Sequence, residues 1–200
     1  DRANHNVLEV YRLLREHEKS LDIPPQKRRH RIEHLQLLHR GDLGKLGGLN
    51  VIASMQPIHA TSDMAMADRY WGSRCEMAYS WHTHMKAGAT LAFGSDAPVE
   101  SINPLWGIHA AVTRQRPDGS PSEDGWYPEE RLTVEQAVRA YTVGAAHAGY
   151  MEERLGTLTC GKLADLIVLD RDIYNCAPVE IRSARVLATI IGGEWKHRAI

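Results

Sequence analysis

Long hydrophobic runs and an excess of either charge are both absent from this chain of 200 residues. No apolar run approaches the roughly 20 residues that span a bilayer, so we expect no transmembrane helix. Lys and Arg number 24 and Asp and Glu number 25, a balance that offers no basic surface to nucleic acid or to an anionic membrane. The composition therefore predicts neither a nucleic acid nor a membrane as partner.

Cysteine is also scarce. The three cysteines, Cys75, Cys160 and Cys176, are odd in number and widely spaced. They form neither a disulfide framework nor a metal-binding knuckle, and they favour a reducing compartment. The chain opens on Asp1 and Arg2 without the pattern of a signal peptide, so we expect a cytoplasmic location.

Several catalytic motifs are missing. There is no G-x-S-x-G elbow, so a serine hydrolase has no support. There is no Walker A loop and no G-x-G-x-x-G fingerprint, so phosphate and dinucleotide binding have none either.

Short apolar runs alternate with helical patterns over the first 150 residues. The runs predict strands over 31–35, 50–56 and 89–93. Helical spacing predicts helices between and around these strands, over 3–18, 42–46, 63–71, 75–87 and 103–115. Thr133 and Gln136 have the spacing of a capping box and predict a further helix start. This alternation indicates the α/β class with a parallel sheet or barrel.

The pattern changes after Gly156. Residues 164–170 predict a buried strand, and 186–191 predict another. Gly192 and Gly193 then lead to 194–196, which indicates a hairpin.

One carboxylate stands out in the first part. Asp96 comes directly after the apolar run 89–93 and Gly94-Ser95, and Pro98 prevents the strand from continuing. Barrel enzymes carry their chemistry at the carboxyl ends of their strands. Taken alone, however, Asp96 is better explained as a cap of the next turn or helix.

Four segments follow one another in a recognisable order: 31–36 (RIEHLQ), 54–59 (SMQPIH), 93–99 (FGSDAPV) and 161–170 (GKLADLIVLD). Together they resemble the metal-dependent amidohydrolase superfamily, in particular the amidohydrolase family 3 branch related to N-substituted formamide deformylases. The resemblance implies the carboxyl-terminal portion of a (β/α)8 TIM barrel with a small β-sandwich domain. Residues 1–150 would then hold barrel strands six to eight, and residues 151–200 the carboxyl-terminal part of the sandwich.

The resemblance also implies a divalent metal in the intact protein, with zinc favoured, although Mn²⁺ and Fe²⁺ also suit mixed His and carboxylate sites and this chain alone could lack the ion. Only His34 and Asp96 match the family's metal ligands, with Asp96 also serving as the general base; the other ligands have no counterpart in this chain. His82 and His84 have a His-x-His spacing, but they fall in a predicted helix, where residues i and i+2 point apart. We expect these two on a solvated helix face.

Gln56 and His59 follow the second strand. At a barrel mouth they would contact the substrate, although a loop histidine without such a role explains His59 equally well. Asp63 is expected to cap the helix 63–71. His109 and His147 are expected to be structural.

The resemblance implies a hydrolase that acts on carbon–nitrogen bonds of small amide-type molecules. The alternative is a catalytically inactive fragment, or a structural protein that assembles with another chain. A partial barrel exposes strand edges, so self-association or pairing with a missing amino-terminal half is expected in either case.

Overall fold

A computed structural model describes residues 1–199 as a mixed α/β fold with two separate three-stranded sheets. The first is parallel, with the order β1-β2-β3, and consists of β1 (Arg31–Glu33), β2 (Ile52–Met55) and β3 (Leu91–Phe93). Each strand lies within a predicted run. All three strands run in the same direction, so their carboxyl ends meet at one edge of the sheet.

Helical segments connect these strands, as parallel pairing requires. The short α2 (Lys45–Gly48) lies between β1 and β2, and α3 (Pro57–Trp71) and α4 (Trp81–Lys86) lie between β2 and β3. Helix α1 (Arg2–Ser20) precedes the sheet, and α5 (Pro104–Thr113) follows it.

Three helix predictions were wrong in their limits. The helix predicted over 42–46 lies at Lys45–Gly48. Helix α3 begins at Pro57 rather than at residue 63, because proline at the first helical position already has a helical φ and needs no N–H partner. The helix predicted over 75–87 is divided into a 3-10 segment, Gly72–Met77, and α4.

The capping box is confirmed. Thr133 Oγ1 accepts a hydrogen bond from the Gln136 N–H, while Gln136 Oε1 accepts one from the Thr133 N–H. The helix that begins there comprises α6 (Val134–Arg139), a π-helical turn (Ala140–Gly144) and α7 (Ala145–Ala148). A β-carbon at Gly144 would lie 2.0 Å from the Leu91 carbonyl oxygen, so glycine lets this helix approach β3 closely.

The second sheet is antiparallel and consists of β4 (Leu166–Leu169), β5 (Val186–Ile191) and β6 (Glu194–Arg198). The hairpin through Gly192 and Gly193 is confirmed. The strand predicted over 164–170 is confirmed as β4, but its predicted burial was wrong, since Ile167 and Val168 are 46% and 37% exposed.

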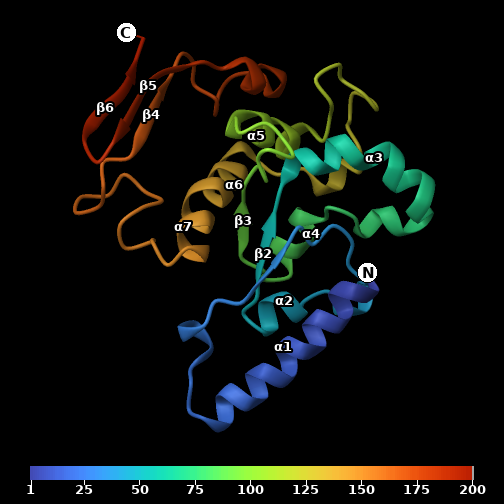
Figure 1. The fold of residues 1–200 in the computed structure, drawn as a ribbon. Coiled ribbons are helices and arrows are strands. Elements are labelled where there is room, and N and C mark those ends of the chain that lie inside the picture. Colours follow the sequence, from blue (N-terminus) through green and yellow to red (C-terminus); the bar gives the residue numbers. More distant parts are fainter. Residues whose placement is uncertain (200) are drawn as a thin grey trace.

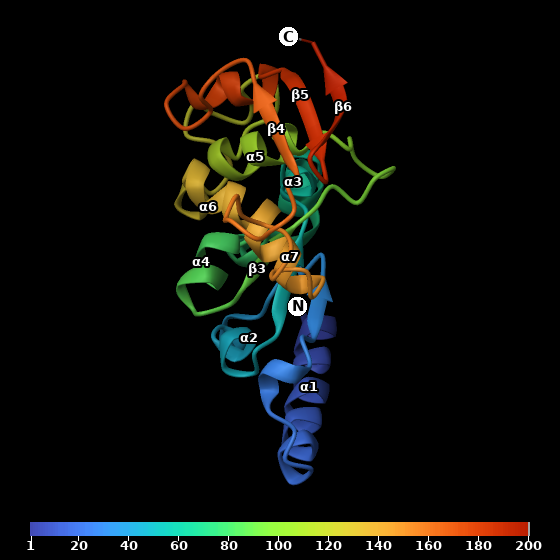
Figure 2. The same ribbon diagram turned by 90° about the vertical axis from the view of Figure 1, so that its left-hand side faces the viewer.

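Helix α1 and the antiparallel sheet lie at opposite ends of the molecule, with the parallel sheet between them (Figures 1 and 2). The main core surrounds the parallel sheet and includes buried side chains from strands and helices alike, among them Ile32, Met55, Phe93, Met64, Trp81 and Ile108. Within residues 1–199, no helix is long and apolar enough to cross a membrane. The cytoplasmic location stays a prediction.

Candidate metal centre

His34 is the first residue after β1. Its N–H donates to the Ser54 carbonyl oxygen at 2.7 Å, which continues the β1–β2 pairing by one residue. The backbone then turns, with φ of 69° at His34 and 43° at Leu35. Positive φ is uncommon outside glycine and costs free energy. The turn fixes His34 at the carboxyl edge of the sheet.

Asp96 lies at the same edge, after β3. The Gly94 N–H donates to the Met55 carbonyl oxygen at 3.1 Å, and the Val99 N–H donates to the carbonyl oxygen of Asp96 at 2.8 Å. Asp96 also has a positive φ, 57°. Two of the three residues at this site thus have an unfavourable backbone conformation, as is common at functional sites.

His59 reaches the same place from the first turn of α3. The backbone passes from β2 through Gln56 into the helix, and the His59 N–H donates to the Gln56 carbonyl oxygen at 3.0 Å. The imidazole is buried, with 9% of the side chain exposed, whereas the side chains of His34 and Asp96 are 46% and 38% exposed. The site is therefore open on one side and closed on the side of α3.

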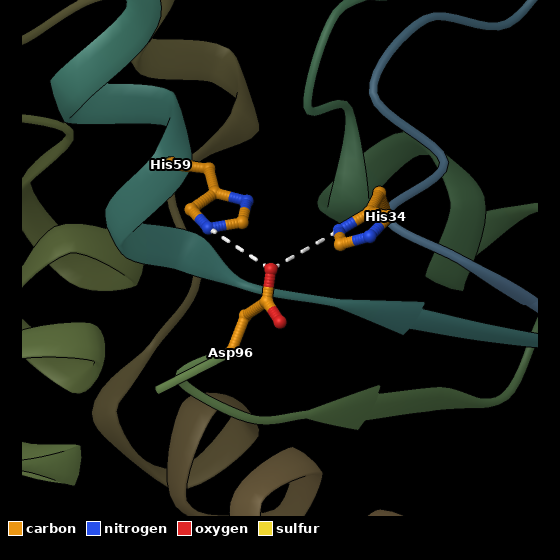
Figure 3. Close-up of side chains that lie close together, drawn as sticks. All are labelled: His34, His59 and Asp96. Atoms are coloured by element: carbon orange, nitrogen blue, oxygen red, sulfur yellow. Dashed lines mark ion pairs between the residues drawn. The ribbon is translucent and has the colours of Figure 1, made fainter. Parts of the chain in front are cut away.

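The three side chains converge (Figure 3). One Asp96 carboxylate oxygen, Oδ2, lies 4.0 Å from His34 Nδ1 and 3.8 Å from His59 Nε2. One potential ligand atom from each residue lies within 4.8 Å of the other two. The imidazole rings stack at 26°, with 5.7 Å between their centroids.

Gln56 and Glu33 complete the surroundings. Gln56 is 7% exposed, and its Oε1 lies 2.9 Å from His34 Nδ1. Glu33 lines an open cleft together with Ser54, Gln56 and Gly94. Burial raises the pKa of Glu33, but hydrogen bonds from Ser54 and Arg31 outweigh it and keep that pKa below its usual value. Glu33 therefore adds a negative charge beside the sheet edge at neutral pH.

The residues suit a divalent cation. Two imidazoles and one carboxylate are a common donor set for zinc in hydrolases. His59 Nε2 is buried and has no hydrogen-bond partner among residues 1–199. A buried polar atom without a partner is unusual, and a bound cation would satisfy it.

The His-x-His pair lies elsewhere. His84 is 1% exposed, so the prediction of a solvated face was wrong for this residue, and burial lowers its pKa to about 4. His82 Nδ1 lies 2.7 Å from the Glu129 carbonyl oxygen. In the described part of the chain, neither residue belongs to a group of three potential metal ligands.

Asp63 does not cap a helix, because α3 starts six residues earlier. Its Oδ2 accepts a hydrogen bond from the Tyr79 hydroxyl at 2.6 Å. His109 is buried in α5, where burial and the charge of Arg182 lower its pKa to about 4.

Sequence reasoning gave His34 and Asp96 as metal ligands and placed His59 at the same barrel mouth as a substrate contact, so it did not count His59 among the ligands. The one clue to His59 was its position just beyond the second strand, since parallel strands bring their carboxyl ends to one edge. The distance from His59 to Asp96 depends on where α3 begins, and that start was predicted six residues too late.

Comparisons with known proteins agree with this architecture. Residues 3–195 match the amidohydrolase family. The chain is 36% identical over 196 residues to Protein LONG AFTER FAR-RED 3 of Arabidopsis thaliana, covering 97% of this chain and 32% of that protein. It is 29% identical over 169 residues to N-substituted formamide deformylase of Arthrobacter pascens, covering 84% and 30%.

A solved structure is also similar. An uncharacterized metal-dependent hydrolase from Pyrococcus horikoshii aligns with a TM-score of 0.72 and 28% identity, over 89% of this chain and 34% of that one. The chain thus spans about a third of the length of each of these three proteins. Because the family match covers nearly the whole chain, the chain belongs to the amidohydrolase family.

Proposed function

We propose that this chain is part of a metal-dependent hydrolase that acts on carbon–nitrogen bonds of small, non-peptide amides. The observation that carries the proposal is the convergence of His34, His59 and Asp96 at the carboxyl edge of a parallel sheet. The activity is proposed for the whole protein, since the relatives are about three times as long as this chain.

The proposed architecture is a (β/α)8 barrel. Its strands six, seven and eight would be β1, β2 and β3, within residues 1–150, and β4–β6 would belong to a small β-sandwich within residues 151–200. The parallel order β1-β2-β3 with helical crossovers supports the first part, and the separate antiparallel sheet supports the second.

The cofactor in this proposal is a divalent cation, with zinc favoured by the His and carboxylate donors. Such a cation, when bound, lowers the pKa of a coordinated water to about 7. His34 and Asp96 would hold it. Asp96 also acts as general base: it accepts a proton from the attacking water and delivers it to the departing amine nitrogen.

Gln56 lies beside His34 in the structure, and in the proposal it contacts the substrate. His34 Nδ1 faces both Gln56 Oε1, at 2.9 Å, and Asp96 Oδ2, at 4.0 Å. A ring nitrogen that binds a cation cannot also hold the amide hydrogen bond. Cation binding at Nδ1 would therefore free the Gln56 amide to contact an amide-type substrate.

Formamides are the first substrates to try, because one relative is named an N-substituted formamide deformylase. The test measures amine release from N-substituted formamides and cyclic amides with added Zn²⁺ or Mn²⁺, beside the metal content of the purified protein. We expect turnover that a chelator removes and that Asp96→Ala abolishes. Turnover unchanged by both treatments would contradict the proposal.

A second proposal concerns assembly. We propose that the chain pairs with a further polypeptide segment, either another copy or an amino-terminal half, and that it could act as a structural piece without its own catalysis. Exposed apolar side chains on the antiparallel sheet support this, namely Ile167, Ile191 and Trp195 at 46%, 51% and 52% exposure. Light scattering after size exclusion tests it: a strict monomer with no affinity for added amino-terminal half would contradict the proposal.

A further inference from the structure

We infer that His59 is a direct third ligand of the divalent cation, so that His34, His59 and Asp96 bind one ion without any other part of the protein. The inference rests on the metal site of the proposed function. It goes further because the resemblance in sequence supplied only His34 and Asp96 as ligands, and it assigned His59 to the substrate.

The environment of His59 Nε2 favours a bound cation. The atom is buried, faces Asp96 and has no hydrogen-bond partner in the described part of the chain. A histidine that merely packed in the core would donate or accept through this nitrogen, because buried polar atoms are nearly always paired.

The distances from Asp96 Oδ2 to the two histidine nitrogens also favour a shared cation. Asp96 Oδ2 lies 3.8 Å from His59 Nε2 and 4.0 Å from His34 Nδ1. Both separations are too long for hydrogen bonds, which end near 3.2 Å. Two ligand atoms around a tetrahedral zinc ion lie about 3.4 Å apart, given bond lengths of about 2.0–2.1 Å. A contraction of a few tenths of an ångström would thus bring each nitrogen to that separation from Oδ2, and one potential ligand atom from each of the two histidines already lies within 4.8 Å of the other.

The three side chains are also held by three different elements of the fold. His59 is fixed by the first turn of α3, and His34 and Asp96 by turns directly after β1 and β3. Three ligands from three different elements approach from three directions (Figure 3). Three protein ligands leave a fourth position for water, as in catalytic zinc sites with two histidines and one carboxylate.

The buried side chain of His59 is poorly placed to contact a substrate. Only 9% of the His59 side chain is exposed, against 46% for His34. The cleft along the parallel sheet is lined by Gln56, Glu33 and Ser54, and none of His34, His59 and Asp96 lines it. A substrate in that cleft would meet these residues first.

The test uses Co²⁺ and Zn²⁺ with the purified 200-residue chain. Zinc-loaded wild type is examined by X-ray absorption, which counts imidazole ligands and needs no variant. Cobalt titrations of wild type, His34→Ala, Asp96→Ala, His59→Gln and His59→Cys follow, with His17→Ala as the matched control, since His17 is an exposed histidine on the long helix α1. Circular dichroism checks that each variant is folded.

We expect one ion per chain and two imidazoles in its shell. His59→Gln should weaken binding more than about 100-fold, beyond the 10–100-fold loss typical of residues that only orient a ligand. His59→Cys should add a thiolate-to-cobalt charge-transfer band that wild type, with its three native cysteines, does not show. His17→Ala should bind as wild type does.

Two results would overturn the inference, and they can be told apart. A single imidazole in the shell, with binding that needs His34 and Asp96 but not His59, leaves the proposed metal site in place and removes His59 from it. No binding by the wild-type chain removes the three-residue site altogether, and the metal centre of the proposed function then has to depend on ligands outside this chain.

Discussion

The parallel and antiparallel sheets are built from similar apolar runs but differ in their exposure to solvent. In β3, Leu91, Ala92 and Phe93 are all at most 7% exposed, whereas in β4 Ile167 is 46% exposed and Val168 37%. The difference lies in what covers each sheet. The π-helical turn and α7 pack on β3, and α3 packs on α5 beside it, while β6 is exposed along its whole length.

The candidate chemistry lies only at the well-covered sheet. His34 and Asp96 have positive φ angles, and such conformations persist only where the surrounding structure holds them. A buried sheet with helices packed on it can provide that support. An exposed hairpin cannot, and in the described part of the chain the antiparallel sheet carries no group of three potential metal ligands.

Truncation of one aromatic side chain in each sheet should give the largest difference in the free energy of unfolding. Phe93→Ala should lower the free energy of unfolding by about 3–5 kcal/mol, because it empties a buried site. Trp195→Ala, at a residue 52% exposed, should cost less than about 1 kcal/mol. Urea unfolding curves measure both. Equal losses would show that β6 is covered in solution, as assembly predicts.

Cation binding should sharpen the contrast. Zn²⁺ at 100 times its dissociation constant should raise the free energy of unfolding by about 2.7 kcal/mol, since it binds only the folded state. Hydrogen exchange should slow near His34 and Asp96 and stay unchanged in β4–β6. The Asp96→Ala chain is the control, and an equal gain there would place the ion elsewhere.

Acid should act first on the region of the parallel sheet. Burial lowers the pKa of His84 to about 4, so between pH 6.5 and 4 the unfolded chain takes up a proton that the folded chain refuses. The free energy of unfolding should therefore fall with pH, by about 2 kcal/mol between pH 7 and pH 5 from this residue. Unfolding curves across this range, with His84→Gln removing its share, measure the effect.

The end of β4 should respond at lower pH. Hydrogen bonds from Arg171 and Arg185 hold the pKa of Asp170 well below its usual 3.8. A lowered carboxyl pKa contributes stability above the unfolded value, and that contribution disappears only as the pH falls below it. If the antiparallel sheet instead loosened between pH 6.5 and 4, the assignment of that range to the buried histidines His84 and His109 would be wrong.

The smallest effects concern ion pairs. Arg29 donates to both carboxylate oxygens of Glu152, and the two side chains are 15% and 28% exposed. Glu152→Gln should cost about 1 kcal/mol. Glu194 pairs with Lys196 on exposed β6, and Glu194→Gln should cost less than about 0.5 kcal/mol. Thermal unfolding of the two variants side by side makes the comparison, and a reversed order would contradict it.

Much of the fold could be predicted from local patterns. The three parallel strands lie inside apolar runs, and the capping box at Thr133 formed as its spacing required. Burial was harder to predict. Exposure was predicted wrongly for the run 164–170 and for His84, because burial depends on segments distant in sequence that cover them.

The candidate site shows the same limit. Asp96 and His34 follow strands, and the resemblance to the amidohydrolase superfamily was needed to name them as ligands, since strand ends alone left simpler explanations for both. His59 depends on the exact start of α3, which proline at position 57 sets two residues before it. A helix start displaced by six residues moves a side chain out of reach, so this third residue required the structure.

The positive φ angles at His34 and Asp96 also bear on protein engineering. Glycine at either position would relieve backbone strain, and asparagine at 96 would tolerate it well. Selection for heat resistance alone would therefore favour variants that have lost these side chains. Stability and the proposed cation binding are therefore in opposition at the same two residues, and a thermostable library should be screened for cation binding before anything else.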